Sequence, residues 1–295
     1  MEIRTDLAME AEALHRGKNL PRGVCVRRET CCGVDADVVE IRTTCAAAAV
    51  GKPKGTYITL DIGQVLHRER DSFSRTATAI ATHLKGLLAL PPSLPVLVAG
   101  LGNREITPDS LGPLTADHIF VTRHMLREMP RQFGRFRPVS AVIPGVLGTS
   151  GLETAEAVRA FQQKVEAAAV IAVDAIAARD TQRLCSTVQL SDTGICPGSG
   201  IGNRRSALNE ETVGVPVIAV GVPTVTDAAT MAAELFRRTG ANPDEDALRT
   251  VSSGMIVTAG DMDRRVREVS RVLAFGINLA LQPELNLDDL TDLIY

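Results

Sequence analysis

Short apolar runs alternate with stretches of helical spacing along most of the chain. The runs typical of strands lie at 57–62, 96–99, 139–143, 170–173, 187–190 and 216–220. Helical spacing is found at 70–90, 111–128, 152–168, 227–238 and 264–281. Thr149 is the expected cap of the helix over 152–168. Strands that alternate with helices predict an α/β fold with a doubly wound, mostly parallel sheet.

The remaining stretches carry weaker patterns. Residues 1–55 look polar and irregular, and residues 241–258 look rich in loops. The chain contains no internal repeat, low-complexity tract or clear linker. We therefore expect a single α/β domain over residues 1–295.

Composition excludes several classes of protein. Of the 295 residues, 45% are hydrophobic and 23% are charged, which is typical of a globular protein. A net charge of −3 gives no strong attraction to nucleic acid or membrane, and 3% aromatic residues without Trp provide few stacking platforms. No apolar run reaches the ~20 residues of a membrane span, and the N-terminus lacks a signal-peptide core. We expect a cytoplasmic protein without membrane or direct nucleic-acid partners.

Cysteine and histidine chemistry is weakly indicated. The six cysteines form no C-x-x-C pair, so free thiols are the simpler interpretation and a zinc site the alternative. All five histidines precede residue 125, and no G-x-S-x-G motif marks a serine nucleophile. No metal or cofactor is predicted.

Two aspartates stand where strands are expected to end. Asp174 follows the apolar run 170–173, and Asp109 follows the run 96–99 after a short glycine-containing stretch. Ligands of open α/β sheets bind at the carboxyl ends of the strands, so both side chains are expected in one crevice. Two nearby carboxyl groups cannot both ionise cheaply, and the pair can therefore act as acid and base on a water molecule.

Both aspartates also have other interpretations. Asp109 precedes a predicted helix, where aspartate is a favoured N-cap. The two acids could instead hold a divalent metal, although a zinc site usually includes a histidine and none is close to them in sequence.

Two glycine-rich segments lie near the two aspartates in sequence, one before Asp109 and one after Asp174. Gly100-Leu101-Gly102-Asn103 lacks the third glycine of a dinucleotide fingerprint, so a tight turn is favoured, in which Asn103 could orient a substrate carbonyl. The segment 192–205 begins with the D-T-G of all-β aspartic proteases, but the chain alternates strand and helix and carries no second copy. It also lacks the G-K-S/T ending of a phosphate loop. We predict a structured active-site loop with supporting roles for Asp192, Gly198, Ser199 and Gly200.

These motifs together resemble the germination proteases of spore-forming bacteria. The resemblance covers nearly the whole chain, in order, at residues 3–8, 100–103, 107–113, 121–124, 136–141, 144–148, 151–154, 174–179, 191–194, 197–205 and 221–228.

The resemblance implies an atypical aspartic endopeptidase that degrades small acid-soluble, DNA-coating spore proteins during germination. The family's two essential aspartates fall on Asp109 and Asp174. The resemblance further implies a fold similar to hydrogenase-maturation endopeptidases (phosphorylase/hydrolase-like), a homotetramer, synthesis as a zymogen and a location in the forespore or spore core.

The sequence departs from the family pattern in two places. The usual pro-segment before Arg4-Thr5-Asp6-Leu7-Ala8 is nearly absent, which leads us to expect altered zymogen control, and the region 238–255 is short. Alternatives at this point are a metal-dependent endopeptidase of the hydrogenase-maturation type, a binding or scaffold protein on the same fold, and a nucleotide-binding enzyme.

Overall fold

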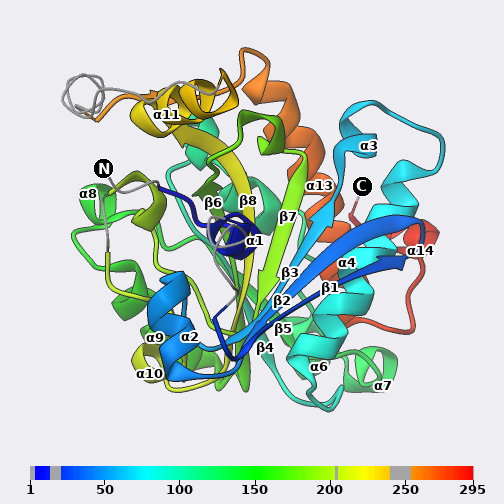
Figure 1. The fold of residues 1–295 in the computed structure, drawn as a ribbon. Coiled ribbons are helices and arrows are strands. Elements are labelled where there is room, and N and C mark those ends of the chain that lie inside the picture. Colours follow the sequence, from blue (N-terminus) through cyan, green and yellow to red (C-terminus); the bar gives the residue numbers. More distant parts are fainter. Residues whose placement is uncertain (1–3, 14–20, 203–204, 240–253, 295) are drawn as a thin grey trace.

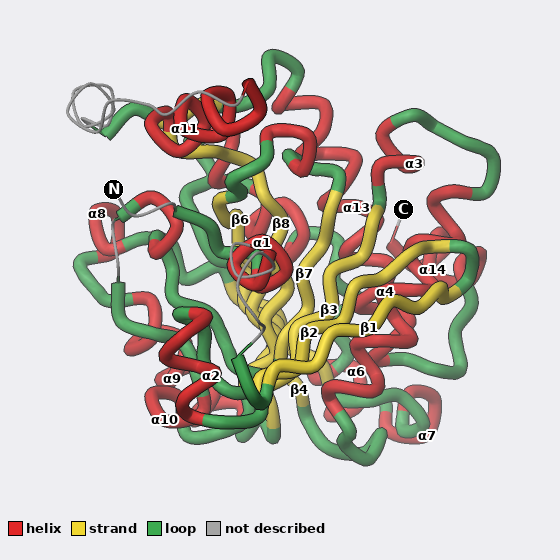
Figure 2. Tube along the Cα trace, in the orientation of Figure 1, coloured by secondary structure: helices red, strands yellow, loops and turns green. Residues whose placement is uncertain are grey.

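One mixed sheet organises the protein (Figures 1 and 2). The computed structural model describes residues 4–13, 21–202, 205–239 and 254–294. The strand order is β1-β2-β3-β7-β8-β6-β4-β5, with β9 paired to β8. The strands are β1 (Val24–Cys31), β2 (Val34–Ile41), β3 (Gly55–Asp61), β4 (Val96–Gly100), β5 (Val139–Val142), β6 (Ala169–Ala177), β7 (Thr187–Ser191), β8 (Val217–Asp227) and β9 (Ile256–Val257).

Strands β5, β4, β6 and β8 are parallel, as expected, and they form the half of the sheet that carries the two aspartates. The last residue of β4, Gly100, pairs with Val173 of β6. Asp174 therefore lies one position beyond the end of β4. It is not the last residue of its own strand, because β6 continues to Ala177 beside β8.

The other half of the sheet, β7, β3, β2 and β1, is antiparallel. The expectation that residues 1–55 are irregular is wrong, since they contain the β1–β2 hairpin. Strand β2 buries Val38 against one face of the sheet and Val39 against the other. Strand β1 is the edge and carries charged side chains such as Arg27 and Arg28, which hide it from a search for apolar runs.

Helices cover both faces of the parallel half (Figure 1). On one face, Leu84 and Leu273 belong to the cluster that includes Ile171 of β6. On the other, Val158 and Val213 pack with the cluster around Val170. The helices are α1 (Ala8–Ala13), α2 (Thr44–Val50), α3 (Gly63–Leu66), α4 (Ser72–Leu88), α5 (Leu111–Ala116), α6 (Arg123–Glu128), α7 (Pro130–Phe133), α8 (Leu147–Ser150), α9 (Thr154–Val165), α10 (Glu210–Val213), α11 (Ala228–Thr239), α13 (Met262–Leu281) and α14 (Leu287–Ile294), with 3-10 turns η1 (Thr107–Asp109), η2 (Thr181–Arg183) and η3 (Ser199–Ile201).

This two-sided cover explains why the parallel strands read as continuous apolar runs. It also confirms the α/β class. The single-domain prediction for 1–295 stays a prediction.

Two predicted helices differ from the structure. The stretch 111–128 divides into α5 and α6, because Thr122 between them accepts a hydrogen bond from the N–H of Val139 and donates one to the carbonyl of Arg137. The helix expected over 152–168 begins later, at Thr154, after the N-cap residue Glu153. Thr149 does not cap it, since its hydroxyl bonds to the backbone of Val146 in the separate turn α8. Helix α14 was not predicted. Most of the stretch 241–258 lies outside the described residues.

Candidate functional site

A cleft of about 480 Å³ opens beyond the end of β4 and beside β6. Both Asp109 and Asp174 line it, and so do Asn103, Gly198 and Gly200. The crevice predicted from the ends of the apolar runs is therefore where the two acids meet.

Asp109 ends the 3-10 turn η1 and points back to the turn that follows β4. Its Oδ2 accepts a 2.7 Å hydrogen bond from the backbone N–H of Asn103. Gly102, at a φ of +109°, makes this approach possible, because a Cβ there would lie 2.1 Å from the Asp109 carbonyl oxygen. Helix α5 has Ser110 as its N-cap residue and no side-chain cap, so Asp109 does not serve as the helix cap considered from sequence.

Asp174 lies inside the cleft wall and is only 4% exposed. Its Oδ1 accepts a hydrogen bond from the N–H of Ala175 at 3.0 Å. Burial, together with the nearby carboxylates of Asp109 and Asp6, raises the pKa of Asp174 well above its ordinary value.

Close backbone packing brings the two acids together. The N–H of Leu101 donates a 2.8 Å hydrogen bond to the carbonyl of Val173, the residue before Asp174. A Cβ on Gly112 would lie 2.5 Å from that same carbonyl oxygen, and a Cβ on Gly100 would lie 2.3 Å from the carbonyl oxygen of Gly112. Glycines at both positions therefore let the start of α5, and with it the turn η1, pack directly on β4 and β6.

The surroundings of the two acids differ in one respect. Burial raises the pKa of Asp109 too, but the hydrogen bond from Asn103 stabilises its ionised form and opposes that rise. For Asp174, two neighbouring carboxylates add to the effect of burial. The pKa is therefore raised more strongly for Asp174 than for Asp109.

The predicted supporting residues take different places. Asn103 accepts a hydrogen bond from the N–H of Glu105 through its side-chain oxygen at 3.0 Å, so that oxygen also shapes the turn. Ser199 lies in the same loop as Gly198 and Gly200 but lines a neighbouring cavity, where its hydroxyl donates to Asp6. Asp192 is not among the residues that line the cleft, and its Oδ1 accepts a 2.8 Å bond from the N–H of Thr56 at the start of β3.

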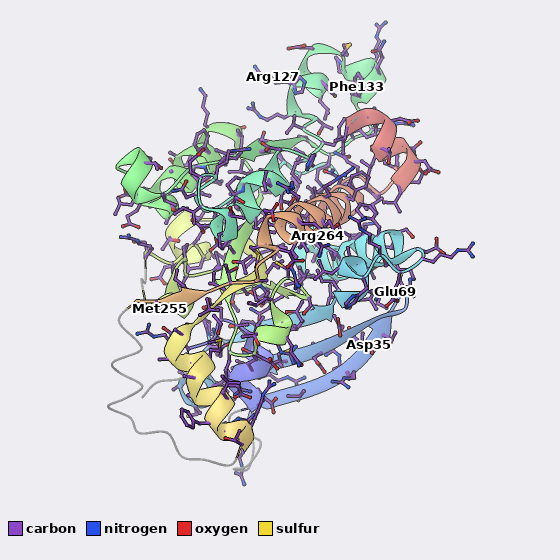
Figure 3. The ribbon with its side chains drawn as sticks, turned by 90° about the horizontal axis from the view of Figure 1, so that it is seen from above. Asp35, Glu69, Arg127, Phe133, Met255 and Arg264 are labelled. Atoms are coloured by element: carbon purple, nitrogen blue, oxygen red, sulfur yellow. The ribbon has the colours of Figure 1, made fainter. Side chains whose placement is uncertain are left out.

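Sequence reasoning did not assign Asp6 or Thr224 to the site, although both line the cleft, and it gave no role to Arg205, which ends the predicted active-site loop and also lines the cleft. Asp6 belongs to the Arg4–Ala8 motif, which served only as part of the family resemblance. The rim also includes Ile256 of β9, next to the exposed Met255 that is labelled in Figure 3.

The six cysteines carry free thiols. Within the described ranges, no group of three or more His, Cys, Asp or Glu side chains is arranged to hold a metal ion. Among the described helices, none is both long and apolar enough to cross a membrane.

The structure is thus that of an α/β protein with two carboxyl groups in one cleft at the ends of parallel strands. Comparison with known proteins supplies the family. The family model described as Germination protease matches residues 2–237. This chain therefore belongs to the germination protease family.

Curated relatives of the same name align over nearly their whole length. The germination protease of Caldanaerobacter subterraneus subsp. tengcongensis is 40% identical, over 99% of this chain and 98% of the relative. That of Clostridium perfringens is 36% identical over 98% of each chain. That of Priestia megaterium is 32% identical over 97% of this chain and 95% of the relative. Protease activity is thus the shared description of these relatives.

Among solved structures, a [NiFe] hydrogenase maturation protease, HycI from Thermococcus kodakarensis KOD1, aligns with 65% of this chain and 96% of its own. The TM-score is 0.35 and the sequence identity is 15%, so this likeness supports no argument about the site.

Proposed function

We propose that this protein is an endopeptidase of atypical aspartic type that starts the degradation of small acid-soluble spore proteins during germination. The observation that carries the proposal is the meeting of Asp109 and Asp174 in one cleft, with Asp174 the stronger holder of a proton. Membership of the germination protease family supports the choice of a peptide bond as the target.

In the proposed reaction, Asp109 is the general base and Asp174 the general acid. Asp109 takes a proton from water as the water oxygen bonds to the peptide carbonyl carbon, while Asp174 gives its proton to the carbonyl oxygen. The tetrahedral intermediate collapses when one hydroxyl returns its proton to Asp174, Asp109 passes its proton to the departing nitrogen and the C–N bond breaks. Both carboxyl groups then stand in their starting states.

The remaining residues of the cleft would hold the substrate. An extended peptide would lie between η1 and the glycine-rich loop at Gly198 and Gly200, whose lack of side chains lets a backbone approach closely. Exposed apolar side chains at the rim, Ile106 and Ile256, would contact apolar residues of that peptide.

Family membership also supports a proposal for the wider setting. We infer a cytoplasmic protein of the forespore or spore core, assembled as a homotetramer, with the altered zymogen control expected from the sequence, with protein substrates and no membrane or nucleic-acid partner. Asp192 would support the loop from outside the cleft by its bond to Thr56.

The test is direct incubation of the purified protein with a small acid-soluble spore protein at neutral pH, followed by mass spectrometry of the products. Internal cleavage at one or a few defined bonds is expected. A folded protein that leaves the spore protein intact, while a relative from Clostridium perfringens cuts it under the same conditions, would contradict the proposed activity.

A further inference from the structure

The segment Arg4–Ala8 lies against the carboxyl end of β6, and its role in the site has not been assigned. The N–H of Asp6 donates a 2.9 Å hydrogen bond to the carbonyl of Ala177, the last residue of β6. In return, the N–H of Ala177 donates a 2.9 Å bond to Oδ2 of Asp6. The segment thus continues the wall that begins at Asp174.

The Asp6 carboxylate joins this wall to the glycine-rich loop. Its Oδ1 accepts a 2.6 Å hydrogen bond from the hydroxyl of Ser199. The next residue, Gly200, packs directly on the carboxylate, since a Cβ there would lie 2.1 Å from Oδ2 of Asp6. One side chain therefore contacts both β6 and the glycine-rich loop, two of the segments that line the cleft.

Buried polar contacts fix the segment in place. The side chain of Gln189, on β7, donates to the carbonyl of Asp6 at 3.2 Å and accepts from the N–H of Ala8 at 2.7 Å. Farther along, the buried Glu10 carboxylate accepts hydrogen bonds from the N–H groups of Arg179 and Asp180, at 2.7 and 3.0 Å. These contacts hold Asp6 at its place from two sides, as a preorganised site requires.

We propose that Asp6 is a positioning residue of the acid pair: it holds the glycine-rich loop as a wall of the cleft and places a third carboxylate beside Asp174. The chemistry that it serves rests on the proposed function. The loop that Asp6 holds would bind the peptide backbone of the substrate. The negative charge of Asp6 would favour the protonated form of Asp174.

The electrostatic part has a defined sign. The carboxylate of Asp6 acts with burial and with Asp109 of η1 to raise the pKa of Asp174. Among the described residues, the other charged side chains that line the cleft are those of Glu153, the N-cap residue of α9, and Arg205. Removing the charge of Asp6 therefore lowers the pKa of Asp174, so that the general acid loses its proton at a lower pH.

The experiment compares Asp6→Asn and Ser199→Ala with the wild type and with Asp263→Asn as a matched control. Asp263 is an exposed partner of Arg267 on α13 and is not among the residues that line the cleft. We expect Asp6→Asn to lower kcat by about 10- to 100-fold and to move the high-pH limb of the activity profile to lower pH. Ser199→Ala keeps the charge, so it should raise KM and leave that limb in place.

A second readout needs no turnover. The free energy of unfolding is measured as a function of pH for the wild type, for Asp6→Asn and for each of these with Asp174→Asn added. The difference that Asp174→Asn makes in each background reports the cost of ionising Asp174. In the Asp6→Asn background this difference should shrink. An unchanged difference in unfolding overturns the proposal, whether or not the wild type cleaves the spore protein. Where the wild type is active, an unchanged limb and kcat overturn it as well. A wild type that cleaves no spore protein contradicts only the proposed function. Should Asp6→Asn fail to fold, an unchanged KM for Ser199→Ala overturns it.

Discussion

The backbone N–H of Asn103 donates a hydrogen bond of 2.7 Å to Oδ2 of Asp109. This bond stabilises the ionised carboxylate and opposes the effect of burial on the pKa of Asp109. Asp174 is more deeply buried and faces two carboxylates, so its pKa is raised more strongly. A single backbone contact thus helps to separate the pKa values of the two carboxyl groups, as the proposed base and acid require.

The raised pKa of Asp174 predicts a pH-dependent cost to stability. Above the ordinary value of 3.8 an unfolded chain loses this proton, whereas the folded protein keeps it until the pH passes its raised pKa. The stability that the protonated carboxyl contributes is therefore present below pH 3.8 and is lost as the pH rises through the folded-state value.

Asp174→Asn removes this ionisation, so the variant should be more stable than the wild type at neutral pH. The difference should disappear as the pH falls toward 3.8. Urea unfolding over this range measures it, with Asp117→Asn as the control, because Asp117 is an exposed partner of Arg104. A variant that is less stable than the wild type throughout the range would mean that Asp174 serves a structural contact instead.

Close packing at Gly112 predicts a strong effect of one methyl group. A Cβ there would lie 2.2 Å from the Leu101 carbonyl oxygen and 2.5 Å from that of Val173, and neither backbone atom can move aside cheaply. Gly112→Ala should destabilise the protein by about 1–3 kcal/mol and lower activity. Gly86→Ala, at an exposed position of α4 where a Cβ would meet no atom within 4 Å, should stabilise it by about 0.5–1 kcal/mol. Equal effects in thermal unfolding would refute the packing argument.

Acid–base catalysis by two carboxyl groups predicts that activity survives exhaustive chelation, because the pair can share a proton unaided. Cleavage rates are measured before and after dialysis against a strong chelator, and again after addition of zinc or magnesium. Loss of turnover on chelation with recovery in a divalent ion would instead support a metallopeptidase that uses the same two aspartates.

The sequence predicted the parts of this site that local patterns encode. Apolar runs located β4 and β6, and the carboxyl-end rule for parallel strands placed Asp109 and Asp174 in one cleft. The end of β6 was misjudged because Asp174 interrupts the apolar run, although the strand continues through Ala175 to Ala177.

Contacts between distant parts of the chain could not be predicted in this way. Asp6 and Ala177 are 171 positions apart, and no periodicity links them. The edge strand β1 escaped notice for a different reason, since none of its side chains is fully buried and charged residues such as Arg27 and Arg28 interrupt its apolar pattern. Both features depend on tertiary contacts, which the local sequence pattern does not encode.

The most direct test of the account is the kcat/KM for a small acid-soluble spore protein of the wild type, Asp109→Asn, Asp174→Asn and the control Asp117→Asn. Circular dichroism and thermal unfolding establish that each variant is folded. Loss of the base or the acid should lower kcat/KM by about 10²-fold or more, while the control stays close to the wild type. Folded Asp109→Asn or Asp174→Asn with activity within about tenfold of the wild type, a barrier change of only about 1.4 kcal/mol, would contradict the assignment of the acid pair.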